Sequence, residues 1–120
     1  MLDCLLVGLG GFVGTVCRYL VGLLPLKTAG GFPVKTLAIN IVGAFVISLI
    51  AALAARRALN PRLVLMLRVG VCGGFTTFST FAYETVELLQ KGSVCAALSY
   101  MLASVALSVL AVFAAQLLVR

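Results

Sequence analysis

The sequence predicts an all-α integral membrane protein, a single domain of 120 residues with four membrane-spanning helices. The apolar fraction is 63%, and only 10% of the residues are charged. Soluble domains average about 45–50% apolar and about 25% charged residues. With a mean hydropathy of +1.25, a soluble chain this short could not bury its apolar surface, so we expect lipid to be its solvent.

Four apolar segments are long enough to cross a bilayer, which takes about 20 residues. We expect helices over 3–24, 36–56, 61–90 and 93–119. Pro25 follows the first segment, Arg56 and Arg57 close the second, and Pro61 is well placed to begin the third. The segments lack the alternation of a membrane strand, and backbone groups in lipid need partners within their own segment, so helices are favoured.

The net charge is +6, and the basic residues lie near the segment ends without forming a basic run. This distribution favours basic side chains at the level of the lipid headgroups over binding to nucleic acid. Positive charge on the two sides of the membrane is nearly balanced, so it predicts orientation weakly. Two interpretations stay open: Arg18 or Arg68 sets one orientation, or the chain inserts both ways and pairs antiparallel. The residues counted on one side are Arg56, Arg57, Arg62 and Arg120, and on the other Lys27, Lys35 and Lys91.

Enzymatic chemistry has little support. The chain has no histidine, and its four cysteines form no CxxC pair, so neither a zinc site nor a redox site is expected. No candidate nucleophile stands beside a base. We therefore predict a protein that is not an enzyme.

The third segment contains GVCGGFTTFSTF over residues 70–81. Adjacent glycines followed by two β-branched threonines weaken a helix, and we expect a break over 73–77. Freed backbone groups in a membrane are tolerated where they are buried or line a cavity, often around an ion. A glycine kink used only for packing is the alternative. The GxxxG pairs Gly10/Gly14 and Gly70/Gly74 could pack helices within one chain or between two chains.

Polar and aromatic residues inside the segments are candidates for an anion path. Asn40 offers two amide donors, although an interhelical hydrogen bond would also explain it. Tyr100, Ser104 and Ser108 recur every four residues on one helix face, and backbone bonding by their hydroxyls is the simpler alternative. Phe78 and Phe81 lie on one helix side, and the positive edges of their rings could hold a small anion weakly enough to release it.

These residues resemble the Fluc (CrcB) fluoride channel family. The motif at 70–81 is the most specific feature, and GGFVGTVCRY at 10–19, TLAINIVGAF at 36–45 and the hydroxyl stripe on the fourth segment agree with it. The resemblance covers essentially the whole chain. Ser48 stands where the family is expected to have a glycine, and it is small enough to leave packing little changed.

The resemblance implies a passive fluoride channel that lowers fluoride toxicity, built as an antiparallel, dual-topology homodimer with two pores in a bacterial-type inner membrane. It also implies a central structural Na⁺ bound by the carbonyls of Gly73 and Thr76 from both subunits. Arg18 would attract anions near a vestibule. Two interpretations of Glu84 stay open: it lies near a pore mouth, or it is an exposed carboxylate at a helix end. The implied pore residues are Phe78, Phe81, Asn40, Tyr100, Ser104, Ser108 and Thr80.

The main alternative is a proton-coupled small multidrug exporter, which could share the four-helix, dual-topology architecture. That chemistry needs a titratable carboxylate deep in the membrane. Asp3 is terminal, and Glu84 and Glu87 lie toward a segment end. A non-transporting assembly subunit is a third possibility, but it leaves the TTFSTF motif unexplained.

Overall fold

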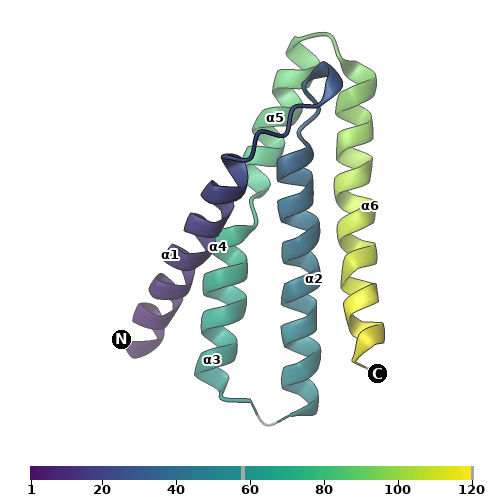
Figure 1. Cartoon of the computed structure of the whole chain (residues 1–120). Coiled ribbons are helices and arrows are strands. Elements are labelled where there is room, and N and C mark those ends of the chain that lie inside the picture. The colour runs from purple at the N-terminus through teal and green to yellow at the C-terminus, as the bar shows by residue number, and fades with distance from the viewer. Residues whose placement is uncertain (58, 120) are drawn as a thin grey trace.

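The computed structural model describes residues 1–57 and 59–119, so Arg120 of the charge count lies outside the described residues. The apolar segments of the described chain are helical apart from two residues of the third (Figure 1), which confirms the all-α prediction. Helix α1 covers Leu2–Gly22, α2 covers Val34–Arg56, and α6 covers Val94–Leu118. The third segment, Pro61–Gln90, completes four stretches that are long and apolar enough to cross a membrane.

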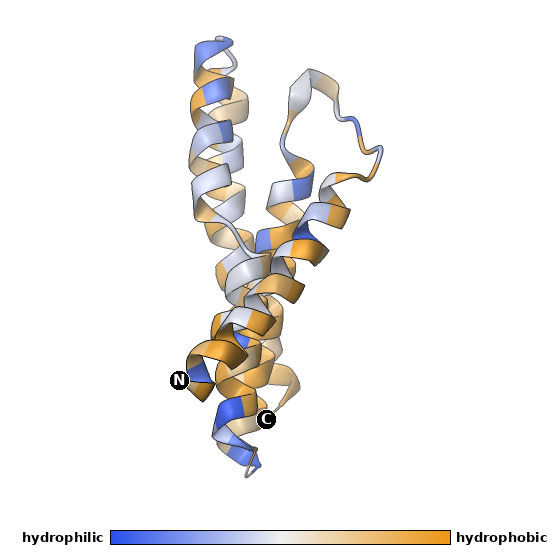
Figure 2. Cartoon of the chain, turned by 90° about the vertical axis from the view of Figure 1, so that its left-hand side faces the viewer, coloured by the Kyte–Doolittle hydropathy of each residue, from blue (hydrophilic) through white to orange (hydrophobic). Residues whose placement is uncertain are grey.

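The surface of the bundle is apolar. Only 11–17% of the most apolar window of each span is buried inside the chain, so most apolar side chains must face lipid or another protein. Figure 2 shows hydrophobic residues dominating the half of the bundle that holds both termini, with hydrophilic residues at the loop that ends this half. This is the surface expected of a multi-pass membrane protein.

Helices α2 and α6 pack along one another, and α1 packs across the first half of the third segment. A small buried cluster of Leu88, Ala97 and Tyr100 joins α5 to α6 at the end opposite the termini. Phe32 and Phe81 pack against this cluster. Phe32 follows the short 3₁₀ turn η1, Ala29–Gly31, in the loop between α1 and α2.

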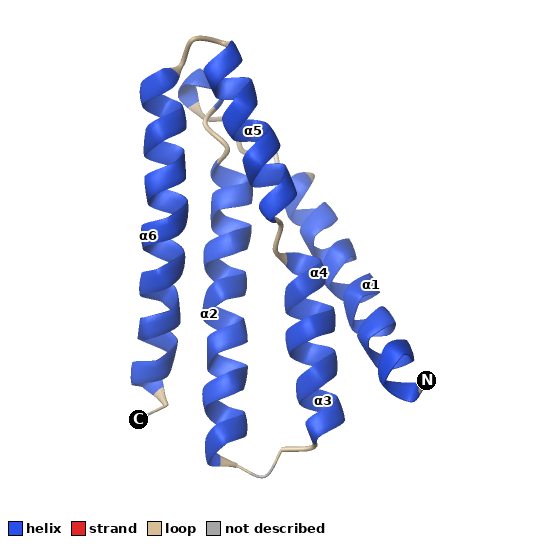
Figure 3. Cartoon of the chain, turned by 180° about the vertical axis from the view of Figure 1, so that it is seen from behind, coloured by secondary structure: helices blue, strands red, loops and turns tan. Residues whose placement is uncertain are grey.

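The third segment is divided into four pieces: α3 (Pro61–Leu65), the π-helical stretch η2 (Met66–Cys72), α4 (Gly73–Phe75) and α5 (Phe78–Gln90). Figure 3 shows the loop between α4 and α5. Its two residues, Thr76 (φ −76°, ψ 157°) and Thr77 (φ −151°, ψ 114°), are extended, and we call them the 76–77 junction. The extended stretch is narrower than the expected 73–77, because both glycines remain helical.

Gly74 stays helical where it packs closely against α1, whereas no atom of α1 lies near the Cβ position of Gly73. A Cβ at Gly74 would lie 2.5 Å from the carbonyl oxygen of Gly11, and one at Gly10 would lie 2.5 Å from that of Met66. A Cβ at Gly14 would meet the backbone of Val71 and that of Phe75. Small residues let helix backbones approach in lipid. Both GxxxG pairs therefore pack within the chain.

Candidate functional site

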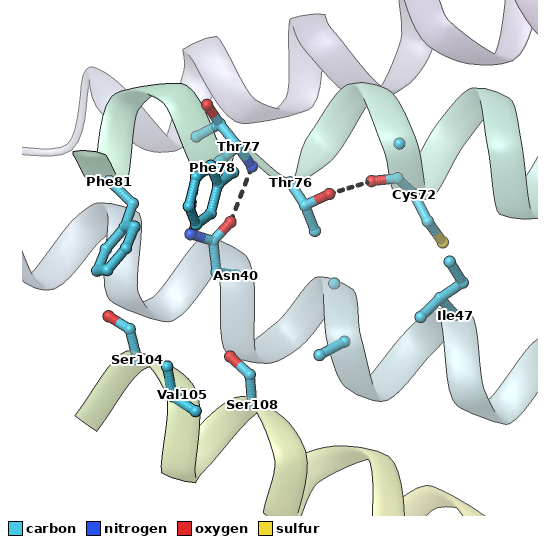
Figure 4. Close-up of a pocket in the computed structure, with 13 residues that line it drawn as sticks. Asn40, Ile47, Cys72, Thr76, Thr77, Phe78, Phe81, Ser104, Val105 and Ser108 are labelled. Atoms are coloured by element: carbon cyan, nitrogen blue, oxygen red, sulfur yellow. Dashed lines mark hydrogen bonds between the residues drawn. The ribbon is translucent and has the colours of Figure 1, made fainter. Parts of the chain in front are cut away.

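The 76–77 junction is held by the side-chain amide of Asn40 on α2. Asn40 Nδ2 donates to Thr77 O at 3.0 Å, and Thr77 N donates to Asn40 Oδ1 at 2.8 Å (Figure 4). In a continuous helix, the Thr77 N–H would donate to the carbonyl of Gly73 four residues earlier. Asn40 replaces this helical bond and contacts both backbone groups of Thr77, which lets the chain leave helical geometry without an unpaired N–H.

The two threonines close one helix and begin the next. Thr76 is the C-cap of α4, and its Oγ1 donates to Cys72 O, the last carbonyl of η2, at 2.9 Å. Thr77 is the N-cap of α5, because its Oγ1 accepts from Thr80 N at 3.2 Å. Thr77 Oγ1 also donates to Thr80 Oγ1 at 3.0 Å. The sequence TTFST thus carries a capping signal that places the start of α5 at Phe78.

A cavity of about 360 Å³ lies between α2, the 76–77 junction and α6. Figure 4 shows its lining residues pointing into the space between these elements. Seven of the residues expected at a pore or ion site meet here, although they come from three segments of the chain. They are Asn40, Gly73, Thr76, Phe78, Phe81, Ser104 and Ser108.

Three aromatic rings run from this cavity into the buried cluster. The ring centroids of Phe78 and Phe81 are 5.5 Å apart with the planes tilted by 47°, and those of Phe81 and Tyr100 are 5.1 Å apart at 55°. Tyr100 is fully buried, whereas Phe78 is 79% exposed in the single chain. An aromatic side chain this exposed within an apolar protein faces lipid or a second protein surface.

Ser104 presents an unusual hydroxyl to the cavity. Its Oγ is buried and has no hydrogen-bond partner among the described residues. A buried polar group without a partner costs free energy, so a ligand that accepts its hydrogen would be stabilised there. Ser108 lies one turn further along α6 in the same cavity, and Phe81 points toward Ser104 (Figure 4).

The Tyr100 hydroxyl, in contrast, is already engaged. It donates to Glu84 Oε2 at 2.7 Å, and Thr36 Oγ1 donates to Glu84 Oε1 at 2.8 Å. Its hydrogen is therefore committed to a carboxylate. Glu84 is half-buried rather than exposed, and Thr36 is a site residue that sequence reasoning missed. No spacing pattern links these residues, because they come from α2, α5 and α6.

Arg18 and Thr80 line a second cavity, of about 550 Å³, between α1, α2 and α5. Glu84 also lines it, and Thr77 borders both cavities. Arg18 Nη1 donates to Thr76 O at 3.1 Å. The expected site residues thus fall on two sides of the 76–77 junction, and the guanidinium of Arg18 is bound to the junction itself.

The described residues contain no group of three histidine, cysteine or acidic side chains that could hold a metal ion. Backbone oxygens at the junction are the remaining ligands. Gly73 O does not accept a hydrogen bond from Thr77 N–H, because this N–H donates to Asn40 Oδ1. Thr76 O accepts one hydrogen bond from Arg18 and keeps a second lone pair. Carbonyl oxygens suit a hard cation.

Four apolar helices, an extended junction and two cavities at that junction define a multi-pass integral membrane protein. Residues 5–116 match the family described as CrcB-like protein, Camphor Resistance (CrcB), and the chain belongs to this family. This confirms the resemblance that the sequence motifs indicated.

Curated relatives match along nearly the whole chain. A protein of Agrobacterium fabrum is 47% identical over 100% of this chain and 98% of its own length. One from Rhizobium meliloti is 46% identical over 97% of this chain and 94% of its own length. One from Chlorobaculum tepidum is 44% identical over 100% of this chain and 96% of its own length. Each is named fluoride-specific ion channel FluC.

Proposed function

We propose that the chain forms a fluoride-selective channel of the bacterial inner membrane, through which F⁻ leaves the cytoplasm passively. The observation that carries this proposal is the buried Ser104 hydroxyl without a partner, placed beside Phe81 in a cavity inside a membrane-spanning bundle. The relatives named fluoride-specific ion channels point to the anion.

The cavity supplies the groups that a small anion needs when it loses water. Ser104 and Ser108 offer hydroxyl donors, and Asn40 Nδ2 keeps one hydrogen beyond the bond to Thr77. The edges of Phe78 and Phe81 carry partial positive charge. The residues lining this cavity are all uncharged, so binding stays weak enough for release, as conduction requires.

A homodimer would complete the path. The cavity is open in the single chain, and the exposed ring of Phe78 at its edge calls for a covering surface. Small polar paths in oligomers are commonly closed by a symmetry-related copy. The near balance of positive charge on the two sides supports insertion in both orientations and antiparallel pairing.

A structural Na⁺ at the centre of this dimer is the cofactor we propose. The carbonyls of Gly73 and Thr76 from two copies would supply four oxygen ligands. When bound, the ion would fix the two junctions against each other, and it would not be transported. The Gly73 carbonyl, which lacks the Thr77 N–H as a donor, supports this assignment.

Fluoride efflux from liposomes that hold the purified protein tests the proposal. We expect F⁻ efflux without any proton gradient, and Cl⁻ efflux slower by orders of magnitude. Equal rates for the two anions would refute selectivity. Efflux that requires a proton gradient would instead favour the exporter alternative. No covalent step is involved in the proposed transport.

A further inference from the structure

Arg68 is a charged residue inside a membrane-spanning segment. It lies in η2, seven residues after α3 begins, which is about 10 Å along the helix axis. Its side chain is exposed, and it makes no hydrogen bond or ion pair with the described residues. An arginine exposed to lipid is unfavourable, by about 3 kcal/mol at the centre of a spanning helix, so its guanidinium faces water or a partner.

The acidic side chains of the chain do not neutralise Arg68. Asp3 pairs with Arg62 at 3.1 Å. Both carboxylate oxygens of Glu84 accept hydrogen bonds from hydroxyls. Glu87 lies on α5, in the half of the bundle opposite α3. The charge of Arg68 is therefore available to a mobile anion.

A cavity of about 520 Å³ that Arg68 lines adjoins the cavity of the candidate site. Arg68 is the one ionisable residue among those that line it, and the other six are apolar. Ile47 and Gly73 line both this cavity and the cavity of Ser104. Figure 4 places Ile47 and Cys72 at the end of the site cavity away from Phe81, so the two cavities adjoin at that end.

The direction of Arg68 follows from the packing of its neighbour. Gly70 faces α1, because a Cβ there would lie 2.8 Å from the carbonyl oxygen of Val7. Residues two apart in a helix point to nearly opposite sides, because two steps cover about half of a turn in an α-helix and in the slightly wider π-helix of η2. Arg68 therefore points away from α1, toward the side where Ile47 of α2 lies.

We propose that Arg68 recruits anions to the end of the path opposite the Glu84–Tyr100 pair. Its guanidinium raises the local concentration of F⁻ where Ile47 and Gly73 border the site cavity. Arg18 is bound to the Thr76 carbonyl, whereas Arg68 keeps all its donors free for an anion. The inference rests on the proposed fluoride path and adds to it a second entrance with its own charge.

A charge series at this position tests the inference. Arg68→Lys, Arg68→Gln and Arg68→Glu are reconstituted in liposomes of neutral lipid, and fluoride efflux is measured below saturation. At low ionic strength we expect the lysine variant to match the unsubstituted protein, the glutamine variant to be about tenfold slower, and the glutamate variant to be slower still. At about 1 M salt, where the Debye length is about 3 Å, the differences should shrink to about twofold.

Arg62→Gln is the matched control, because it removes the same charge from the same segment outside the cavity and should leave efflux unchanged. Arg68→Met replaces the glutamine variant if the latter does not elute as folded protein. The inference is overturned if neutral variants conduct as well as the unsubstituted protein at low ionic strength. It also fails if the lysine variant is as slow as the glutamine variant, or if the loss persists at high salt, since both indicate a structural role.

Two other results reject the inference while leaving the channel proposal intact. If the glutamine variant elutes only as a monomer, Arg68 pairs with a second copy. If the loss appears only in vesicles that contain phosphatidylglycerol, the guanidinium binds a lipid phosphate. Failure of the unsubstituted protein to carry fluoride in the same vesicles would instead refute the proposed function itself.

Discussion

Replacing Asn40 with leucine should uncouple the 76–77 junction from α2. The substitution keeps a side chain of similar size and removes both hydrogen bonds to Thr77, at 2.8 Å and 3.0 Å. Thr77 is 7% exposed, so its freed N–H cannot simply turn to water, whereas its C=O, as the carbonyl of the N-cap residue, keeps the first intrahelical hydrogen bond of α5. The junction must either accept one unpaired N–H or rearrange.

The size of the effect follows from the Thr77 N–H, which loses its partner, and from the Thr77 C=O, which loses one of two hydrogen bonds. An interhelical side-chain hydrogen bond in a membrane averages about 0.6 kcal/mol, because unfolded segments find other partners. A buried backbone group left without any partner costs about 1–3 kcal/mol. We therefore expect Asn40→Leu to lower the free energy of unfolding by about 2–4 kcal/mol. Fluoride efflux should fall more than tenfold, because Phe78 begins the helix directly after the junction.

Unfolding of the purified protein in mixed micelles and fluoride efflux from liposomes measure the two effects. Ser48→Ala is the matched control on α2: it removes one hydrogen bond, to Val112 O at 3.0 Å, and should cost less than about 1 kcal/mol. If Asn40→Leu costs no more than this control and conducts within twofold of the unsubstituted protein, then the amide does not hold the junction.

Three further substitutions test the packing and the site. Gly14→Val should prevent close approach of α1 to η2 and greatly reduce the yield of folded protein on size-exclusion chromatography, whereas Gly8→Val adds its side chain to open space and should be tolerated. Ser104→Ala should slow fluoride efflux about tenfold, because it removes one hydrogen-bond donor to the anion. It should not lower stability, because Ser104 Oγ has no hydrogen-bond partner to lose. The control variant Ser99→Ala should change neither efflux nor stability. Glu84→Gln keeps an acceptor for one hydroxyl donor and places an amide N–H against the other, and we expect about 1–3 kcal/mol of destabilisation in the same unfolding assay.

The helical spans follow from the sequence because bilayer thickness dictates the length of an apolar run. Their observed ends differ from the expected ones by at most two residues. The extended stretch was expected to include Gly73, but the backbone stays helical until Phe75. Glycine weakens a helix on its own, and this reasoning ignored the stabilisation that Gly70 and Gly74 gain by packing against α1.

Long-range partners explain what sequence reasoning missed. Asn40 and Thr77 are 37 positions apart, and Glu84 is 48 positions from Thr36, so no local spacing connects them. The face shared by Tyr100 and the two serines on α6 was predictable from helical periodicity. The hydrogen bond from Tyr100 to the carboxylate of Glu84 was not predictable, because helical periodicity gives no information about the facing helices. The π-helical stretch η2 was also not predicted from the sequence.

The amide of Asn40 also dictates an order of events during synthesis. Asn40 precedes Thr77 by 37 positions in the sequence, so it is synthesised before the junction that it holds. At about 5–20 residues per second, the ribosome adds Thr77 about 2 to 7 s after Asn40. When the third segment emerges, the second already offers the donor and acceptor that Thr77 needs. A circular permutant that places the third segment ahead of the second would have to insert Thr77 with its backbone N–H unpaired.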